Sequence, residues 1–359
     1  MKKIKVGSDF SGVGAFNQAL MRLGITYEEV FACDMDKYAR QTFVHNYGEP
    51  NYYPENVYNR EIPSESLDIY MTSPPCQAFS LAGKRLGKDD KRGVLFFNSL
   101  EFIEKNKPRF FIFENVKGLL SDDNGKTFQE WINFLGGKSV NGLPVIFPYD
   151  DSVEYHIYWK VLNAKKHGVP QNRERVFIIG IRDDQDNLFQ FPKEEHLTKR
   201  LKDVLEEQVD EKYFLSERAL DYLFSDSKSQ SANTLQESNT CRTLMAGDYK
   251  CPPTIKVKSA TQCGYETACE GDSINFSVPS SKTRRGRVGK NVSQTLDTGC
   301  NQGTLINERI RRLTPLECFR LMDFPDSFTW PVSDSQAYKQ AGNSIVVAVL
   351  AKIINKLPL

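Results

Sequence analysis

The first half of the chain alternates short apolar runs with segments of helical periodicity. Apolar runs that predict β-strands lie at residues 4–6, 29–32, 67–71, 109–113, 155–158 and 176–179. After the first run, Phe16, Ala19, Leu20 and Leu23 recur at a spacing that places them on one face of a helix. Alternating strands and helices predict a βαβ series, and therefore an α/β fold with a parallel sheet. Ligands bind such a sheet at the carboxyl ends of its strands, so candidate functional residues are expected there.

The pattern changes after residue 185. Residues 186–304 are rich in Ser, Thr, Asn and Gly and have no sustained helical period, which predicts a second, smaller, irregular and β-leaning domain. Helical periodicity returns over residues 305–359, and the apolar stretch 345–354 is expected to pack back on the first domain. Residues 136–151, with two adjacent glycines and two prolines, predict a surface loop.

The overall charge gives no hint of a partner, but its distribution does. The 359 residues include 47 Lys and Arg against 46 Asp and Glu. Residues 282–312 carry eight basic and two acidic residues, whereas residues 183–211 carry four basic and ten acidic residues. This segregation predicts a basic face backed by an acidic outer surface.

Other features of the sequence argue against several classes of protein. The best apolar run, residues 344–354, is too short to span a bilayer, and no apolar signal-peptide region follows the basic start of the chain. The eight cysteines form no Cys-x-x-Cys pair, so buried thiols are expected in place of disulfides or a metal site. The sequence therefore predicts a cytoplasmic protein with no metal and no membrane segment.

Candidate chemistry lies beside the predicted strands. The turn at residues 9–14 follows the first strand and contains two glycines that let a ligand approach the backbone, while Asp34 ends the second strand, where an acid can bind ribose hydroxyls. Cys76 follows two prolines after the third strand, Glu114 follows the fourth, and residues 171–175 lead into the last. Taken singly, each feature has a structural alternative. The glycine turn also suits close packing, Cys76 a buried thiol, Glu114 a solvated loop acid, and residues 171–175 a surface charge cluster. Their convergence on one sheet favours a nucleotide-type ligand beside a nucleophile and an acid.

Six ordered blocks resemble the motif series of bacterial DNA (cytosine-5)-methyltransferases of the restriction-modification type. They are Phe10-Ser11-Gly12-Val13-Gly14, Pro74-Pro75-Cys76-Gln77, Glu114-Asn115-Val116, Gln171-Asn172-Arg173-Glu174-Arg175, the run from Arg312 to Leu321, and Gln340-Ala341-Gly342-Asn343-Ser344. The resemblance covers nearly the whole chain except its middle. It implies the Rossmann-like sheet of a class I S-adenosylmethionine-dependent methyltransferase, with residues 1–185 as the catalytic and cofactor-binding domain. Residues 186–304 would form the target-recognition domain, and residues 305–359 would return to the catalytic domain.

The resemblance also implies a reaction, in which a cytosine is flipped out of duplex DNA and methylated at carbon 5. The Cys76 thiolate would add to carbon 6 and so make carbon 5 nucleophilic. Glu114 would share a proton with ring nitrogen 3, and Arg175 would hold the carbonyl oxygen of the base. Arg173 would assist near the thiol or a phosphate, and Asn115 would order the loop around Cys76.

The resemblance implies a pocket for S-adenosyl-L-methionine. Asp34 matches the ribose-binding acid of the family, and Met35 occupies a place that often carries an aromatic residue against adenine. Asn56-Val57 is the best match to an Asp-hydrophobic pair that contacts adenine. The other expected cofactor residues are Phe10, Ser11, Gly12, Gly14, Pro75, Leu95, Asn343 and Ser344.

Double-stranded DNA is the implied partner. The basic segment 77–93 fits a loop that closes over the flipped base, with contacts from Gln77, Ser80, Lys84 and Arg85. In the recognition domain Arg284, Arg285 and Arg287 suit phosphates or guanine edges. Thr295-Leu296 resembles a Thr-Leu pair that family members carry near the end of this region, and Thr243-Leu244 is an equal rival.

Alternative functions come from three classes. A transfer-RNA cytosine-5 methyltransferase uses the same motifs, but the middle region is longer than that subfamily needs. A catalytically idle DNA-binding protein would not need Cys76, Glu114 and Arg175, and a nicotinamide dehydrogenase would not need Pro-Pro-Cys. We expect a monomer that protects host DNA, with a cognate restriction endonuclease that acts on the same site without forming a stable complex.

Overall fold

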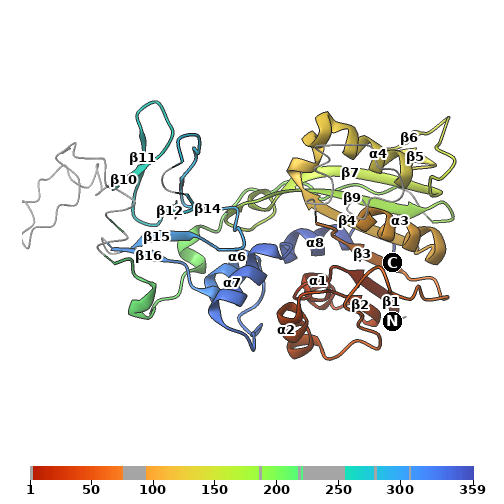
Figure 1. The fold of residues 1–359 in the computed structure, drawn as a ribbon, viewed down its shortest axis with the longest axis horizontal. Coiled ribbons are helices and arrows are strands. Elements are labelled where there is room, and N and C mark those ends of the chain that lie inside the picture. Colours follow the sequence, from red (N-terminus) through yellow and green to blue (C-terminus); the bar gives the residue numbers. More distant parts are fainter. Residues whose placement is uncertain are drawn as a thin grey trace, which may run out of the picture.

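The larger part of the molecule is built on an eight-stranded sheet (Figure 1). The computed structural model describes residues 3–75, 94–185, 188–216, 220, 255–278, 281–306 and 309–359. The strand order is β2-β1-β3-β4-β9-β7-β5-β6. These strands are β1 (Ile4–Asp9), β2 (Tyr27–Cys33), β3 (Ile69–Thr72), β4 (Phe110–Val116), β5 (Ser139–Val140), β6 (Leu143–Pro144), β7 (Tyr155–Asn163) and β9 (Glu174–Arg182).

All six strands expected in the first half of the chain are present, but their directions differ from the expectation. Strands β1 to β4 are parallel to one another, whereas β9 is antiparallel to both β4 and β7. The expected parallel sheet is therefore confirmed for β1 to β4, and the exception among the expected strands is the direction of β9. The connection from Asn163 to Glu174 is too short for a parallel crossover, which needs a dozen or more residues. As a result, the amino end of β9 lies at the carboxyl edge of β4.

Helices cover both faces of this sheet because its central strands are apolar on both sides. Along β4, Phe110 and Ile112 belong to one buried cluster, and Phe111 and Phe113 belong to the other. The first cluster includes residues of α1 and α8, which pack on each other, and the second includes residues of α3 and α4. The helices of the described chain are α1 (Ala15–Arg22), α2 (Lys37–Tyr47), α3 (Val94–Asn106), α4 (Lys126–Leu135), α6 (Pro315–Leu321), α7 (Asp334–Asn343) and α8 (Val347–Ile354). Helix α8 is the apolar segment that was expected to pack on the first domain.

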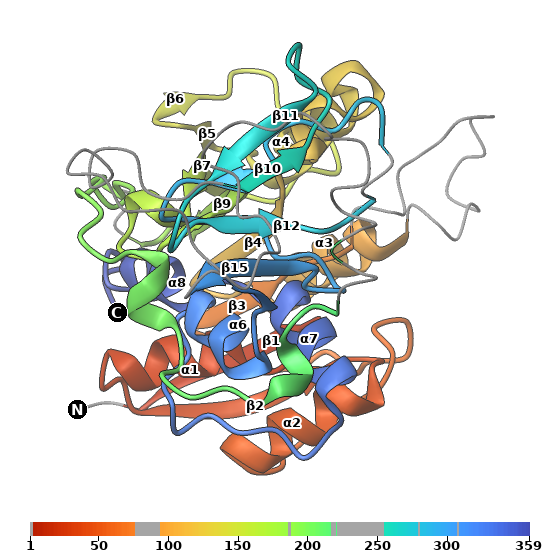
Figure 2. The ribbon, with the colours of Figure 1, turned by 90° about the vertical axis from the view of Figure 1, so that its left-hand side faces the viewer.

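The smaller part is a β-structure beside the large sheet (Figures 1 and 2). Its four-stranded antiparallel sheet has the order β13-β12-β15-β16 and its own apolar cluster. The strands are β12 (Ser273–Asn275), β13 (Val288–Gly289), β15 (Gln302–Ile306) and β16 (Arg309–Arg312), and a hairpin of β10 (Ile255–Lys258) and β11 (Tyr265–Ala268) lies nearby. Strand β16 extends this sheet past residue 304.

Two short strands connect the parts. β8 (Gln171–Asn172) pairs in parallel with β14 (Ser293–Gln294), so the segment that precedes β9 is hydrogen-bonded to the smaller part. Helix α6 begins where the chain returns from the smaller sheet. The Thr314 hydroxyl accepts a hydrogen bond from the Glu317 amide, and the Glu317 carboxylate accepts one from the Thr314 amide, which makes a capping box ahead of Pro315. A buried ion pair between Arg311 and Glu317, 2.6 Å long, joins β16 to this helix.

In the part of the chain that the structure describes, no helix has both the length and the apolar character needed to cross a membrane. The surface loop expected at residues 136–151 contains the two-residue strands β5 and β6 at the edge of the large sheet.

Candidate active site

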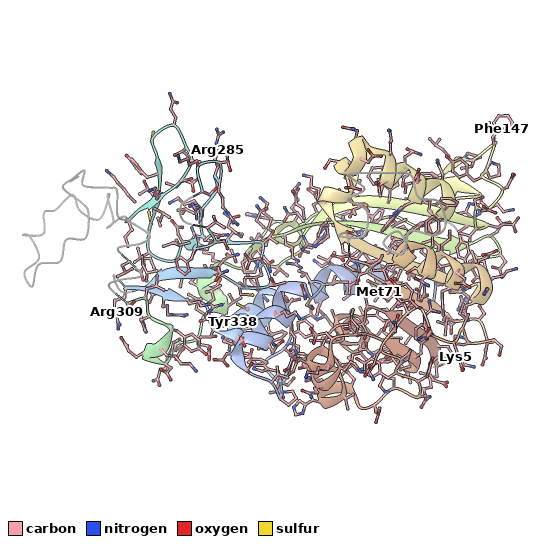
Figure 3. All side chains as sticks on the ribbon, in the orientation of Figure 1. Lys5, Met71, Phe147, Arg285, Arg309 and Tyr338 are labelled. Carbon is pink, nitrogen blue, oxygen red and sulfur yellow. The ribbon has the colours of Figure 1, made fainter. Side chains whose placement is uncertain are left out.

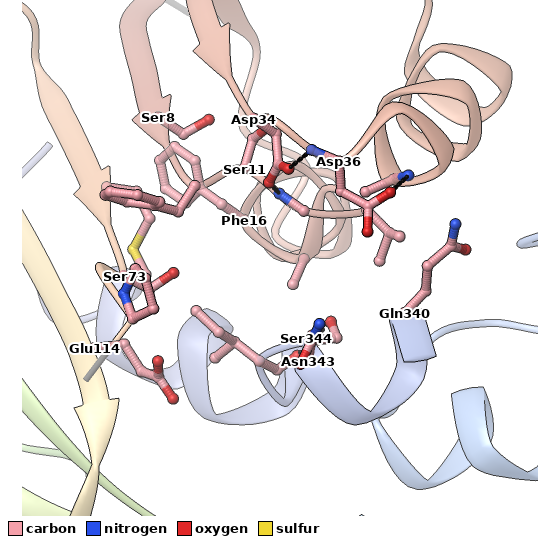
Figure 4. Close-up of a pocket in the computed structure, with 18 of the residues that line it drawn as sticks. Ser8, Ser11, Phe16, Asp34, Asp36, Ser73, Glu114, Gln340, Asn343 and Ser344 are labelled. Carbon is pink, nitrogen blue, oxygen red and sulfur yellow. Dashed lines mark hydrogen bonds between the residues drawn. The ribbon is translucent and has the colours of Figure 1, made fainter. Parts of the chain in front are cut away.

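A cavity of about 690 Å³ lies where strands β1 to β4 end (Figure 4). This volume is within the range of small-molecule sites in proteins. Its wall contains Asp9 at the end of β1 and Phe10 after it, Asp34 after β2, Pro74 and Pro75 after β3, and Glu114 near the end of β4. Other residues of the wall are Ser11, Gly12, Phe16, Asp36, Asn115, Arg173, Arg175, Lys339, Gln340, Asn343 and Ser344. The cavity thus lies at the sheet edge that the sequence singled out.

The turn after β1 is held in place by the end of β2. Asp34 accepts hydrogen bonds from the backbone amides of Gly12 (2.7 Å) and Asp36 (2.8 Å), and the Ser11 amide donates to the Cys33 carbonyl (3.0 Å). Phe10 and Gly12 have positive φ angles of 58° and 55°. Burial raises the pKa of Asp34, and the hydrogen bonds from the two amides oppose that shift. The Asp34 carboxylate therefore fixes the glycine turn beside the cavity.

The two glycines of this turn have different surroundings. A Cβ atom added to Gly12 would meet no heavy atom within 4 Å, so the backbone there faces open space in the cavity wall. A Cβ added to Gly14 would lie 2.2 Å from the Tyr47 ring, and Gly14 does not line the cavity. Gly14, at φ 83°, is the N-cap of α1 and packs on α2. It was expected to let the cofactor approach, but the structure gives it a packing role.

Four other residues expected at the cofactor do not line the cavity. The Met35 side chain is 87% exposed, Val57 is buried in the apolar cluster, and Leu95 packs against that cluster. Asn56 is exposed, and its side chain accepts a hydrogen bond from the Tyr58 amide (2.9 Å). These expectations came from motif position, which does not fix the direction of a side chain.

Glu114 and Arg175 form an ion pair on the cavity wall. Arg175 Nε lies 3.1 Å from Glu114 Oε1. Burial raises the pKa of Glu114, and the positive charges of Arg175 and Arg173 oppose that shift. Asn115, the next residue, is also buried, and its side-chain amide donates to the Pro74 carbonyl (2.9 Å).

Cys76 and the DNA-contact residues Gln77, Ser80, Lys84 and Arg85 lie outside the described residues. Pro75, which precedes Cys76, lines the cavity together with Glu114 and Arg175.

Arg173 joins three segments of the protein. Its guanidinium donates to the carbonyl oxygens of Leu296 (2.9 Å), Gly342 (2.9 Å) and Ser344 (2.8 Å), and only 3% of the residue is exposed. Burial lowers the pKa of Arg173 to about 9, which still leaves the group charged at neutral pH. The guanidinium was expected to act near the thiol or a phosphate; it lines the cavity, and its hydrogen bonds with the described residues brace the backbone there.

A second cleft, of about 370 Å³, lies between the two parts of the molecule. Arg175 and Asn172 line one side, and Thr295 lies at the junction, where its hydroxyl donates to the Asn172 carbonyl (2.7 Å). The cleft is also lined by Lys117, Glu174, Asn275, Arg284, Arg285, Gly286 and Gln294. Thr295-Leu296 therefore adjoins the segment that leads to Arg175, whereas Thr243-Leu244 lies outside the described residues.

The basic stretch 282–312 is less available than its composition suggested. Arg287 was expected to contact DNA, but it is only 1% exposed, and its guanidinium donates to the carbonyls of Asn275 (3.2 Å) and Ser277 (3.0 Å). Lys290 pairs with Asp272 (2.7 Å), and both Arg309 and Arg311 also form ion pairs. Arg284 and Arg285 remain on the cleft.

Sequence reasoning missed several residues of the cavity wall. Phe16 follows the glycine turn by two positions, Lys339 directly precedes the last motif block, and Gln340 begins that block but was not assigned to the site. Lys339 forms an ion pair with Asp36 (2.7 Å), and the Gln340 side chain accepts a hydrogen bond from Thr42 (3.0 Å). The position of these residues within or beside a recognised motif block was the signal that could have identified them.

This architecture defines a class of protein. A Rossmann-like sheet with helices on both faces, a glycine turn fixed by an acid after β2, and a ligand-sized cavity at the carboxyl edge are typical of methyltransferases that use S-adenosylmethionine.

Comparisons with known proteins specify the family. The family model for C-5 cytosine-specific DNA methylases matches residues 4–358. The orphan methyltransferase M.SPRI of Bacillus phage SPR is 33% identical over 449 aligned positions, which cover 99% of this chain and 98% of that protein. The type II methyltransferase M.HhaI of Haemophilus parahaemolyticus is 33% identical over 346 positions, covering 96% of this chain and 91% of that protein. The chain belongs to the C-5 cytosine-specific DNA methylase family, and is therefore a DNA cytosine-5 methyltransferase.

Solved structures agree on the fold. A mutant of DNMT2 from Spodoptera frugiperda superposes with a TM-score of 0.64 at 19% identity, covering 98% of this chain and 99% of the other. At this identity the likeness concerns the fold alone. The matching family is described as acting on DNA, which favours DNA methylation over the transfer-RNA alternative.

Proposed function

We propose that this enzyme binds S-adenosyl-L-methionine in the cavity at the ends of β1 to β4 and methylates a cytosine that it flips out of double-stranded DNA. The observation that carries the proposal is the convergence of Pro75, Glu114 and Arg175 with the Phe10–Gly12 turn on one cavity. Pro75 is adjacent in sequence to the proposed nucleophile, Cys76. A cofactor site and a base site that share one cavity would bring the methyl donor close to its acceptor.

Three observations fit the cofactor to this cavity. The backbone at Gly12 leaves open space that a ligand can fill. The Asp34 carboxylate accepts two amide hydrogen bonds, which leaves lone pairs for ribose hydroxyls. Gln340 is buried and lines the cavity, and its Nε2 has no hydrogen-bond partner among the described residues. When bound, S-adenosyl-L-methionine would supply an electrophilic methyl group.

The protein residues would activate the base. The Cys76 thiolate adds to carbon 6 of cytosine and moves electron density to carbon 5 and ring nitrogen 3. Glu114, whose pKa is raised by burial, shares a proton with nitrogen 3 and so limits the charge that develops there. Arg175 holds the carbonyl oxygen of the base, and Asn115 orders the loop before Cys76 through the Pro74 carbonyl. Carbon 5 would then bond to the methyl group as the bond from that methyl to the sulfonium sulfur breaks. Loss of the carbon 5 proton and elimination of the thiolate would complete the reaction.

The cleft lined by Arg284, Arg285 and Thr295 would hold the duplex next to the cavity, because Arg175 lines both spaces. Arginine side chains in such a cleft can contact phosphates and base edges. We also propose a domain boundary at residue 185, a monomeric state and a cytoplasmic location; the second boundary, expected at residue 304, would follow β16, because the smaller sheet continues to Arg312.

A cognate restriction endonuclease is also proposed as a partner that recognises the same site without a stable complex. Among the relatives, M.HhaI is named a type II methyltransferase and M.SPRI an orphan methyltransferase. Protection of host DNA against an endonuclease in extracts of the source cells would test this part separately.

Bisulfite sequencing of DNA from cells that express the protein tests the function. Methylated cytosines are expected in one sequence context, and Cys76→Ala should abolish them while calorimetry still detects binding of S-adenosyl-L-methionine. Cys263→Ala is a matched control because that thiol is exposed in the smaller β-structure and should be dispensable. Unmodified DNA with the wild-type enzyme would refute the function, and methylation by Cys76→Ala would refute the mechanism.

A further inference from the structure

The turn that carries Arg284 and Arg285 is held by a carboxylate. Glu266 on β11 accepts hydrogen bonds from the amides of Gly286 (2.9 Å), Arg287 and Val288 (3.1 Å). Gly286 has a φ of 66°, a left-handed conformation that lets successive amides converge on one anion. Hydrogen bonds to an ionised acceptor are stronger than neutral ones, so Glu266 fixes this turn from outside the smaller sheet.

The same turn is held from inside by the buried Arg287 side chain. Its guanidinium reaches the carbonyls of Asn275, Ser277 and Val278, on the segment that follows β12. The Arg284 carbonyl accepts a further hydrogen bond from the Ala260 amide (2.9 Å). Groups of opposite charge, Glu266 and Arg287, therefore bind the backbone on both sides of the turn. The backbone of this turn is therefore held by the protein itself, without a ligand.

The two arginines that the turn presents differ in their freedom. Arg285 is exposed, and its Nε donates to the Ala260 carbonyl (3.1 Å) (Figure 3). Arg284 is half-buried on the cleft, and its guanidinium makes no hydrogen bond or ion pair with the residues that the structure describes. An unpaired planar guanidinium on a fixed backbone turn can form two parallel hydrogen bonds with O6 and N7 of guanine.

The surroundings of Arg284 favour a base over a phosphate. The cleft is also lined by Gln294, whose residue type can contact base edges, and by Arg175 of the proposed base site. Arg285, at the exposed rim, is better placed for a phosphate.

We infer that Arg284 reads a guanine close to the target cytosine, and that Glu266 and Arg287 are positioning residues that aim it. This inference rests on the proposed function. The position of the Arg284 guanidinium matters because a bidentate contact tolerates little displacement. Loosening the turn should therefore weaken discrimination at one base pair without altering the chemistry at the cytosine.

The test uses the full-length enzyme and a library of duplexes with randomised bases around a cytosine, analysed by bisulfite sequencing. The wild type should require guanine at one flanking position, and Arg284→Ala should lose about 10- to 100-fold of that discrimination while other positions keep theirs. Glu266→Gln places an amide donor against backbone amides, and should raise the KM about tenfold for duplexes with the required guanine but not for the others, with kcat and the KM for cofactor unchanged. Glu266→Asp should recover part of the loss.

Two controls separate positioning from general destabilisation. Arg285→Ala should raise the KM for every sequence alike, and Glu49→Gln, an exposed acid outside the smaller β-structure, should change nothing. Replacing the required guanine with 7-deazaguanine removes N7, and should impair the wild type but not Arg284→Ala. Full discrimination by Arg284→Ala at every position would overturn the inference while the proposed function stands. A wild type that methylates no duplex would instead refute the proposed function.

Discussion

Arg175 Nε lies 3.1 Å from Glu114 Oε1, across the neighbouring antiparallel strands β9 and β4. The Arg175 side chain is 16% exposed and the Glu114 side chain 10%. Their proximity follows from the direction of β9. If β9 were parallel to β4, its amino end would lie at the opposite edge of the sheet, and no arginine from this motif would reach the cavity.

This pair should set the alkaline limit of activity. Burial raises the pKa of Glu114, so the folded enzyme retains the proton to a higher pH than a free carboxyl does. We expect kcat to fall as pH rises through this raised pKa, because the proton for ring nitrogen 3 is lost. Arg175→Gln removes a charge that lowers the pKa, so the alkaline limb of its residual activity should move to higher pH.

Single-turnover methylation measured between pH 5 and 10 checks this expectation. Glu114→Gln, which cannot ionise, should lose about 10²- to 10⁴-fold in rate and should have no alkaline limb from this group. An alkaline limb that stays in place in Arg175→Gln would contradict the assignment.

Asp34 should determine cofactor affinity. Asp34→Asn removes the charge and leaves one of the amides of Gly12 and Asp36 facing an amide donor, so the turn loosens and a ribose acceptor is lost. We expect S-adenosyl-L-methionine to bind about tenfold more weakly, which corresponds to about 1.4 kcal/mol. Titration calorimetry measures this directly. The adjacent change Met35→Ala should leave the affinity unchanged, since Met35 points away from the cavity, and a large loss in that variant would contradict the observed placement.

Alanine substitutions at the two glycines of the turn should affect different properties: stability at Gly14 and cofactor binding at Gly12. Gly14→Ala places a methyl group against the Tyr47 ring at a positive φ, and should lower the free energy of unfolding by about 2–3 kcal/mol. Gly12→Ala has space for the methyl group, so only the strain of its φ applies, about 1 kcal/mol, but the methyl would occupy the space of the cofactor. Urea denaturation and cofactor titration of both variants separate these effects. Equal loss of stability in the two variants would count against the packing role of Gly14.

Some features of the fold and the site can be predicted from the sequence and others cannot, because each sequence pattern reports only one physical property. Apolar periodicity located all six main strands and the helix at residues 347–354, because burial dictates it directly. The same periodicity carries no information on strand direction. The strand β9 was located, but its antiparallel direction was not predicted. Asp34 and Glu114 were found because strand ends converge on one edge, whereas Arg175 was found because its motif block resembles that of the family. The burial of Arg287 and Arg173 could not be foreseen, since their partners are backbone carbonyls distant in sequence, which leave no trace in residue type.

Arg173 gives a further prediction, on stability. Its guanidinium satisfies the buried carbonyls of Leu296, Gly342 and Ser344, which belong to the junction of the smaller part and to the end of α7. Arg173→Ala leaves these acceptors without a donor and opens a cavity, and should lower the free energy of unfolding by about 3–5 kcal/mol. Arg173→Lys keeps the charge but cannot span all three carbonyls, so an intermediate loss is expected.

Lys105→Ala, which breaks an exposed ion pair with Glu101 on α3, should cost no more than about 0.5 kcal/mol. Urea unfolding curves of the three variants provide the comparison, and an Arg173→Ala protein as stable as Lys105→Ala would show that the brace contributes nothing.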